Sequence, residues 1–118
     1  MAMKKVMHNG KAVVRVEFTV FDIPGHQAEV EEFMQYLSTQ PAASVRAVFL
    51  NIDKIKFSGI MDYYRQKAMD AKRGCKAFAF VGLQGLSKVM FNFIIVSAMM
   101  PMRMSDTEAD ALDFVTKD

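Results

Sequence analysis

The alternation of apolar and polar side chains near the N-terminus predicts a β-hairpin. From Val14 to Val20 every second residue is valine or phenylalanine, and arginine, glutamate and threonine stand between them. This period of two is typical of a strand with one buried face. Residues 4–7 precede that strand, and Asn9-Gly10 between them suits the left-handed backbone angles of a type I′ turn. We therefore expect one strand at 4–7 and a second at 11–21.

The next segment, 26–39, has the period of a helix. Its apolar residues recur at the spacing i, i+3, i+4 and i+7, which places them on one helical face: Val30, Phe33, Met34 and Leu37. Pro24 is placed to open this helix and Pro41 to stop it. A nearly continuous apolar run at 45–52 then predicts a central strand that is covered on both faces.

The alternation of strand and helix continues towards the C-terminus. We expect helices at 58–73 and 86–99, strands at 76–81 and 102–104, and a final helix that carries Leu112 and Val115. Ser58 has a residue type that caps the start of a helix, and Gly74 one that ends it. The four residues from Ser105 to Glu108 fit a capping box for the final helix.

The resulting order, ββαβαβαβα, predicts a single α/β domain over residues 1–118. Parallel strands that are joined through helices require right-handed crossovers. We expect a mixed, mostly parallel sheet of four or five strands with four helices, most of them on one face. The sheet residues that should then be buried are Phe49, Leu50, Phe78 and Phe80.

Composition and charge narrow the class of protein. Hydrophobic residues make up 52% of the 118 residues, which is ample for a folded core. Fifteen basic and thirteen acidic residues are interspersed and leave a net charge of +2, so we expect no nucleic-acid partner. The longest run without a charged residue, 89–102, is shorter than the roughly twenty residues that cross a bilayer, so we expect no integral membrane span.

The chain offers no recognisable catalytic or metal-binding constellation. His8 and His26 have no second ligand at metal-binding spacing, and we expect solvated polar roles for both. Cys75 is the only cysteine, which favours a reducing, cytoplasmic location, and with no histidine close in sequence we expect an inert thiol. We expect no catalytic residue, no metal and no cofactor.

Two stretches of the chain resemble the SpoIIAA-like family, whose fold is of the STAS type. The first is VFLNIDKIKFSG at 48–59, and the second is AFAFVGLQGLSKVMFNFIIVSAMMPMRMSDTEADALDFV at 77–115. In that family a strand ends in V-G-x-x-G-x-x-K, a long apolar helix follows, and a helix led by Asp-Thr closes the domain. The residues that match are Gly82, Gly85, Lys88, Asp106, Thr107, Ala111, Leu112, Phe114 and Val115.

The chain departs from the family at three places. Phe114 stands where the family usually has tryptophan, and Ser105 where it usually has phenylalanine. Classical anti-sigma factor antagonists carry Asp-Ser-Ser-Gly at a helix start and are phosphorylated on the first serine, whereas Phe57-Ser58-Gly59 retains only the serine next to glycine. Ser58 is therefore either a phosphorylation site, favoured by the helix dipole, or a plain helix cap.

The segment from Gly82 to Lys88 has two interpretations. A glycine-bearing turn between strand and helix exposes backbone N–H groups, so Gly82, Gly85 and Lys88 are candidates for an anion-binding turn. The alternative is a tight turn that lets the following helix pack closely on the sheet. The spacing is not that of a P-loop.

The apolar helix expected after this turn is the most unusual feature. A core-facing stripe consists of Leu86, Val89, Met90, Phe93 and Ile94. Phe91, Ile95 and Met99 fall on a different side and are also apolar, where a solvent-facing row would carry charges. Either this second row is buried within the monomer, or it binds a twin subunit, another protein or an apolar ligand.

These observations lead to two functional hypotheses. The family resemblance implies a non-enzymatic, regulatory protein-interaction module, similar to anti-sigma factor antagonists but without an intact phospho-switch motif. Its partner would be another protein, with a homodimer as one form. The alternative is a binder of a lipid-like or small apolar ligand, as in SEC14-like domains.

Overall fold

The computed structural model describes residues 1–55, 61–83, 85, 88–89, 92 and 102–117. Within them a five-stranded sheet has the order β1-β2-β3-β4-β5. Its strands are β1 (Ala2–His8), β2 (Lys11–Glu17), β3 (Val45–Leu50), β4 (Cys75–Val81) and β5 (Met102–Ser105). The described part also contains the short 3-10 helix η1 (Ile52–Lys54) and the α-helices α1 (Ile23–Ser38), α2 (Met61–Ala71) and α4 (Glu108–Val115).

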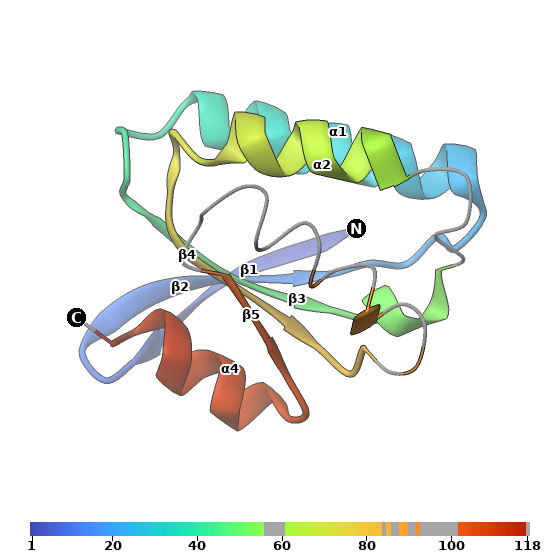
Figure 1. Cartoon of the computed structure of the whole chain (residues 1–118). Helices are drawn as coiled ribbons and strands as arrows, with labels where there is room; N and C mark the ends of the chain where they lie inside the picture. Colours follow the sequence, from blue (N-terminus) through green and yellow to red (C-terminus); the bar gives the residue numbers. More distant parts are fainter. Residues whose placement is uncertain (56–60, 84, 86–87, 90–91, 93–101, 118) are drawn as a thin grey trace.

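The sheet is mixed and mostly parallel, as predicted. β1 pairs with β2 in the antiparallel sense, and β2, β3, β4 and β5 pair in parallel. Helices α1 and α2 cover one face and α4 covers the other (Figure 1). The predicted helix at 86–99 falls largely outside the described residues, although Lys88, Val89 and Asn92 are helical.

The N-terminal hairpin turns as the sequence predicted. Asn9 and Gly10 have φ angles of 51° and 75°, and His8 pairs with Lys11 across the turn. The second strand ends earlier than expected, at Glu17 rather than residue 21, because the chain leaves the sheet there to enter α1.

Helix α1 begins at a capped turn. The carboxylate of Asp22 accepts a hydrogen bond from the Gly25 N–H at 3.0 Å, and proline occupies the first turn. A Cβ atom on Gly25 would lie 2.1 Å from Cγ1 of Val20, so only glycine fits under the incoming chain.

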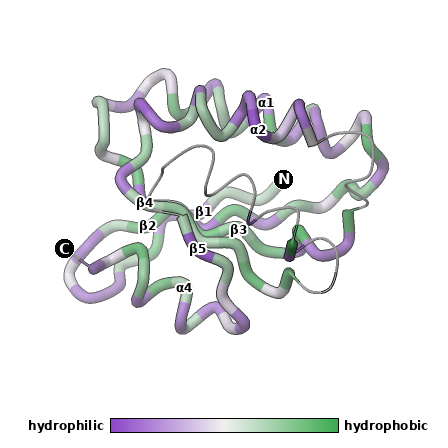
Figure 2. The backbone as a smooth tube through the Cα atoms, in the orientation of Figure 1, coloured by the Kyte–Doolittle hydropathy of each residue, from purple (hydrophilic) through white to green (hydrophobic). Residues whose placement is uncertain are grey.

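The strands carry hydrophobic residues to both faces of the sheet. Figure 2 shows largely hydrophobic central strands between helices of mixed character. The four sheet residues predicted to be buried are buried, at 9% exposure or less: Phe49, Leu50, Phe78 and Phe80. Under α4 the core is built from small side chains, including Ala77, Ala79 and Ala111, which let this helix lie close to the sheet.

The start of α4 differs from the predicted capping box. Ser105 is the last residue of β5, where it pairs with Val81, and it is not the cap. Thr107 is the cap, and its side chain accepts a hydrogen bond from the Asp110 N–H at 3.2 Å. The backbone of Ser105 is engaged by the sheet, so the helix starts two residues later.

Within the described residues, no helix combines the length and the apolar character that a membrane span requires.

Candidate functional site

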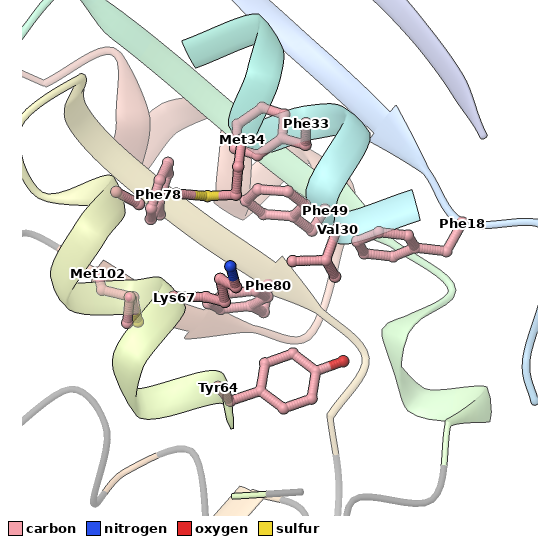
Figure 3. Close-up of a pocket in the computed structure, with 12 residues that line it drawn as sticks. Phe18, Val30, Phe33, Met34, Phe49, Tyr64, Lys67, Phe78, Phe80 and Met102 are labelled. Carbon is pink, nitrogen blue, oxygen red and sulfur yellow. The ribbon is translucent and has the colours of Figure 1, made fainter. Parts of the chain in front are cut away.

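An apolar cavity lies between α1, α2 and the sheet. All of its described lining residues but two are apolar, and they come from both helices, from β3, β4 and β5, and from the chain after β2. They are Phe18, Val30, Phe33, Met34, Phe49, Tyr64, Lys67, Ala68, Ala71, Phe78, Phe80 and Met102 (Figure 3). The cavity volume is about 60 Å³.

The wall of the cavity is a cluster of phenylalanines set by strand register. Phe49 in β3 pairs with Phe80 in β4, and their rings stack with centroids 5.1 Å apart. Phe78 meets Phe49 edge to face at 5.4 Å, and Phe33 descends from α1 onto Phe49 at 5.0 Å. Alternate residues of parallel strands point to one face, which brings these rings together.

The cavity suits an apolar occupant better than water. A buried water molecule needs two to four polar partners. Among the described lining residues only Tyr64 and Lys67 carry polar side-chain atoms.

The charge of Lys67 is already compensated at the rim. Its ammonium forms an ion pair with Glu31 and lies 5.4 Å from the centre of the Tyr63 ring. The Tyr63 hydroxyl also donates to Glu31 at 2.9 Å. The hydrogen bond from Lys67 lowers the pKa of Glu31. Burial raises the pKa of Tyr63, and the hydrogen bond to Glu31 raises it further.

His26 lies behind the cavity wall and corrects the sequence prediction. We expected a solvated polar role, yet its side chain is 0% exposed. Its ring meets Phe18 edge to face at 4.7 Å and stacks on Tyr64 at 5.5 Å. Neither ring nitrogen has a hydrogen-bond partner in the described part of the chain. Burial lowers the pKa of His26 from its usual 6.5 to about 4, against the opposing charge of Glu29.

A signal for the burial of His26 was present in the sequence. His26 precedes Val30 by four residues, Phe33 by seven and Leu37 by eleven, so it continues the apolar stripe of α1 towards the N-terminus. Because histidine is polar and stands at the start of the helix, it was not counted as part of the apolar stripe.

Glu29 is a second buried titratable residue beside His26. Its carboxylate accepts hydrogen bonds from the N–H groups of Thr19 and Val20, at 3.1 and 2.9 Å, and from the Thr19 hydroxyl. It also pairs with the Met1 ammonium at 2.6 Å. Burial alone would raise the pKa of Glu29, but these hydrogen bonds, the one from Met1 foremost, outweigh it and lower the pKa.

In the glycine-bearing segment after β4, the described residues favour a tight turn over an anion site. Gly82 and Gly85 have φ angles of 87° and 60°, and Lys88 is exposed. The Gly82 N–H donates to the Ser105 carbonyl at 3.0 Å, so it is not available to an anion. The carboxylate of Asp53 also lies about 3.8 Å from where a Cβ of Gly82 would be, and its charge would oppose an anion there.

The predicted phosphorylation site and the predicted apolar surface fall outside the described ranges of the chain. The residues concerned are Ser58, Phe91, Ile95 and Met99, and their roles stay predictions.

Val89 was assigned to the core-facing stripe, and this was wrong, since it is 54% exposed. Lys88 and Asn92 are exposed on the same side of the helical turn, so these polar residues set the solvent-facing side.

The surroundings of Cys75 and His8 give neither residue a reactive role. Cys75 is buried, and burial raises the pKa of its thiol, which makes it unreactive. His8 forms a surface contact with Asp113 at 2.7 Å. Across the described residues no group of three or more histidine, cysteine or acidic side chains is placed to hold a metal ion.

Comparison of the chain with protein-family models, with curated proteins and with solved structures gave no match.

Proposed function

We propose that this chain is a non-enzymatic binding module that holds a small apolar molecule in the cavity between α1, α2 and the sheet. The cavity and its phenylalanine wall are the observation that carries this proposal. A cytoplasmic location belongs to the proposal and is supported by the free thiol of Cys75.

Incomplete packing among the described residues around this cavity has an energetic cost. Protein interiors are packed as densely as organic crystals, and residual cavities destabilise the fold by about 24 cal/mol per Å³. An apolar occupant of this cavity would therefore gain packing contacts with the surrounding side chains. The aromatic rings and the two methionines around the cavity, Met34 and Met102, can adapt to an occupant of this kind.

Xenon binding tests the proposal directly. Xenon is a small apolar probe that enters dry cavities. Under xenon pressure the methyl signals of Val30, Met34 and Met102 should shift in NMR spectra of the purified chain. Ala68→Leu fills the cavity from α2 and should abolish these shifts, while Ala28→Leu, on the exposed side of α1, should leave them unchanged. Wild-type spectra that do not respond to xenon would contradict the proposal.

A second candidate function is the regulatory protein-interaction module that the family resemblance implies. The observation that favours it is the strand β1, which forms one edge of the described sheet. Met3 and Met7 on this strand are 38% and 69% exposed. An exposed edge strand accepts a further strand from a partner protein.

The geometry of the hairpin shows which backbone groups are available. His8 and Lys11 flank a two-residue turn and form a hydrogen-bonded pair, so the backbone groups of Met3, Lys5 and Met7 point away from β2. Pairing with a second copy of β1 would bring Lys4 and Lys5 near their own counterparts. This favours an extended acidic segment of another protein over a homodimer.

A designed peptide tests this second function. An extended peptide that alternates valine and glutamate should shift the backbone amide signals of β1, and a matched valine and lysine peptide should not. Lys5→Pro removes an outward N–H without touching the pairing to β2 and should abolish the shifts. Lys5→Ala keeps that N–H and should weaken binding only through the lost charge. Equal responses to both peptides would contradict an acidic partner.

A further inference from the structure

We infer that the ligand of this cavity is uncharged and carries a hydrogen-bonding group, such as a hydroxyl or an amide, that His26 recognises. This inference rests on the proposed ligand-binding function and adds the chemical class of the ligand.

His26 is placed to recognise such a group. Phe18 and Tyr64 both line the cavity, as Figure 3 shows, and both are in contact with the imidazole ring. The imidazole therefore stands one ring behind the cavity wall. His26 itself is not among the described lining residues, so the inference includes a rotation of the Phe18 and Tyr64 rings that lets an occupant reach the imidazole.

The hydrogen-bonding capacity of His26 is unused. A neutral imidazole has one N–H donor and one nitrogen acceptor. Neither nitrogen has a partner within the described residues, and the side chain is fully buried. Buried polar groups are nearly always paired, so an unpaired one directly behind the wall of a cavity calls for a partner. A hydroxyl or an amide, which both donate and accept, would satisfy either tautomer.

Glu29 does not supply the missing partner. Its carboxylate already accepts from Thr19, Val20 and the Met1 ammonium. Its negative charge also acts on His26 and would repel an anionic group placed beside that ring.

The ion pair of Lys67 at the cavity also favours an uncharged ligand. Lys67 lines the cavity but its ammonium is paired with Glu31. An anionic ligand would have to displace Glu31, and a cationic ligand would meet the ammonium of Lys67. Since a buried charge without a counter-charge is strongly disfavoured, the ligand is uncharged.

The test compares three probes that share one ring: benzene, phenol and benzoate. Dissociation constants are measured by NMR titration of the wild type and of His26→Leu. We expect phenol to bind the wild type about tenfold more tightly than benzene, because a site that pairs a hydroxyl discriminates against the analogue without it. Benzoate should bind most weakly. His26→Leu should lose the preference for phenol and keep its affinity for benzene.

Two further measurements keep the inference separate from the proposed function. The imidazole nitrogen signals of wild-type His26 should shift on titration with phenol and not with benzene, and His26→Gln, which retains a donor and an acceptor, should keep part of the preference. If benzene and phenol bind equally, or if His26→Leu still prefers phenol, the inference is overturned while the ligand-binding function stands. If xenon binds and none of the three rings does, the inference alone is overturned. If xenon does not bind either, both fail.

Discussion

The imidazole of His26 stacks on the phenol ring of Tyr64, with centroids 5.5 Å apart, and this contact joins the first turn of α1 to the first turn of α2. The two residues are 38 positions apart in the chain. Tyr64 also lines the apolar cavity. The charge state of His26 should therefore affect the stability of the fold.

We expect the free energy of unfolding to fall as the pH is lowered from 7 to 4. The pKa of His26 is about 4 in the folded chain and 6.5 when unfolded, so the unfolded chain binds the extra proton first. The contribution of the neutral His26 ring to the free energy of unfolding is complete above pH 6.5. It is lost progressively as the pH falls from 6.5 through 4. A shift of this size corresponds to about 3 kcal/mol.

Urea denaturation at a series of pH values measures this loss. His26→Leu is the matched control, because it removes the titrating ring and should flatten this part of the profile. His8→Gln, which removes an exposed ring, should leave the loss in place. A wild-type profile identical to that of His26→Leu would show that the ring does not stay neutral in the fold.

Glu29→Gln should lower the free energy of unfolding by about 2 kcal/mol. The neutral amide cannot accept the same set of hydrogen bonds from Thr19, Val20 and the Met1 ammonium, and its own N–H donors would face theirs. Glu32→Gln, an exposed change on the same helix, provides the control and should have little effect. Equal unfolding midpoints for the two variants at pH 7 would contradict this role of Glu29.

Gly25→Ala should destabilise the chain by about 2 kcal/mol, although alanine is the better helix former. The added Cβ would lie 2.1 Å from Cγ1 of Val20 and 2.9 Å from Oδ1 of Asp22. Val20→Ala removes the first clash, so the double variant should recover much of the loss. A thermodynamic cycle over the four proteins measures this coupling, and strictly additive effects would argue against the contact.

The Cys75 thiol should resist labelling by a thiol-specific reagent in the folded chain. It is 5% exposed, and burial raises its pKa, so little thiolate forms at neutral pH. Labelling should become fast in urea, in step with unfolding followed by circular dichroism. Rapid labelling of the native chain would mean that the entrance of β4 opens without global unfolding.

Elements that depend on neighbouring residues could be predicted from the sequence. Asn9-Gly10 specifies its turn because few other residue pairs adopt two positive φ angles in succession. Phe33 and Leu37 mark the buried face of α1 through helical spacing alone. The cap of α4 was misplaced because Ser105 and Thr107 are both good caps, and only the pairing of Ser105 in β5 distinguishes them.

The sequence by itself determined the order of the described strands and helices and the phenylalanines that form the core, because period and residue type act over a few neighbouring positions. Only the tertiary structure decided that His26 is buried and that Phe18, Phe33, Phe49 and Phe80 surround a cavity. Burial of a given side chain depends on which distant segments pack against it. For His26 those are the chain after β2 and helix α2, whose positions follow from the pairing of the whole sheet.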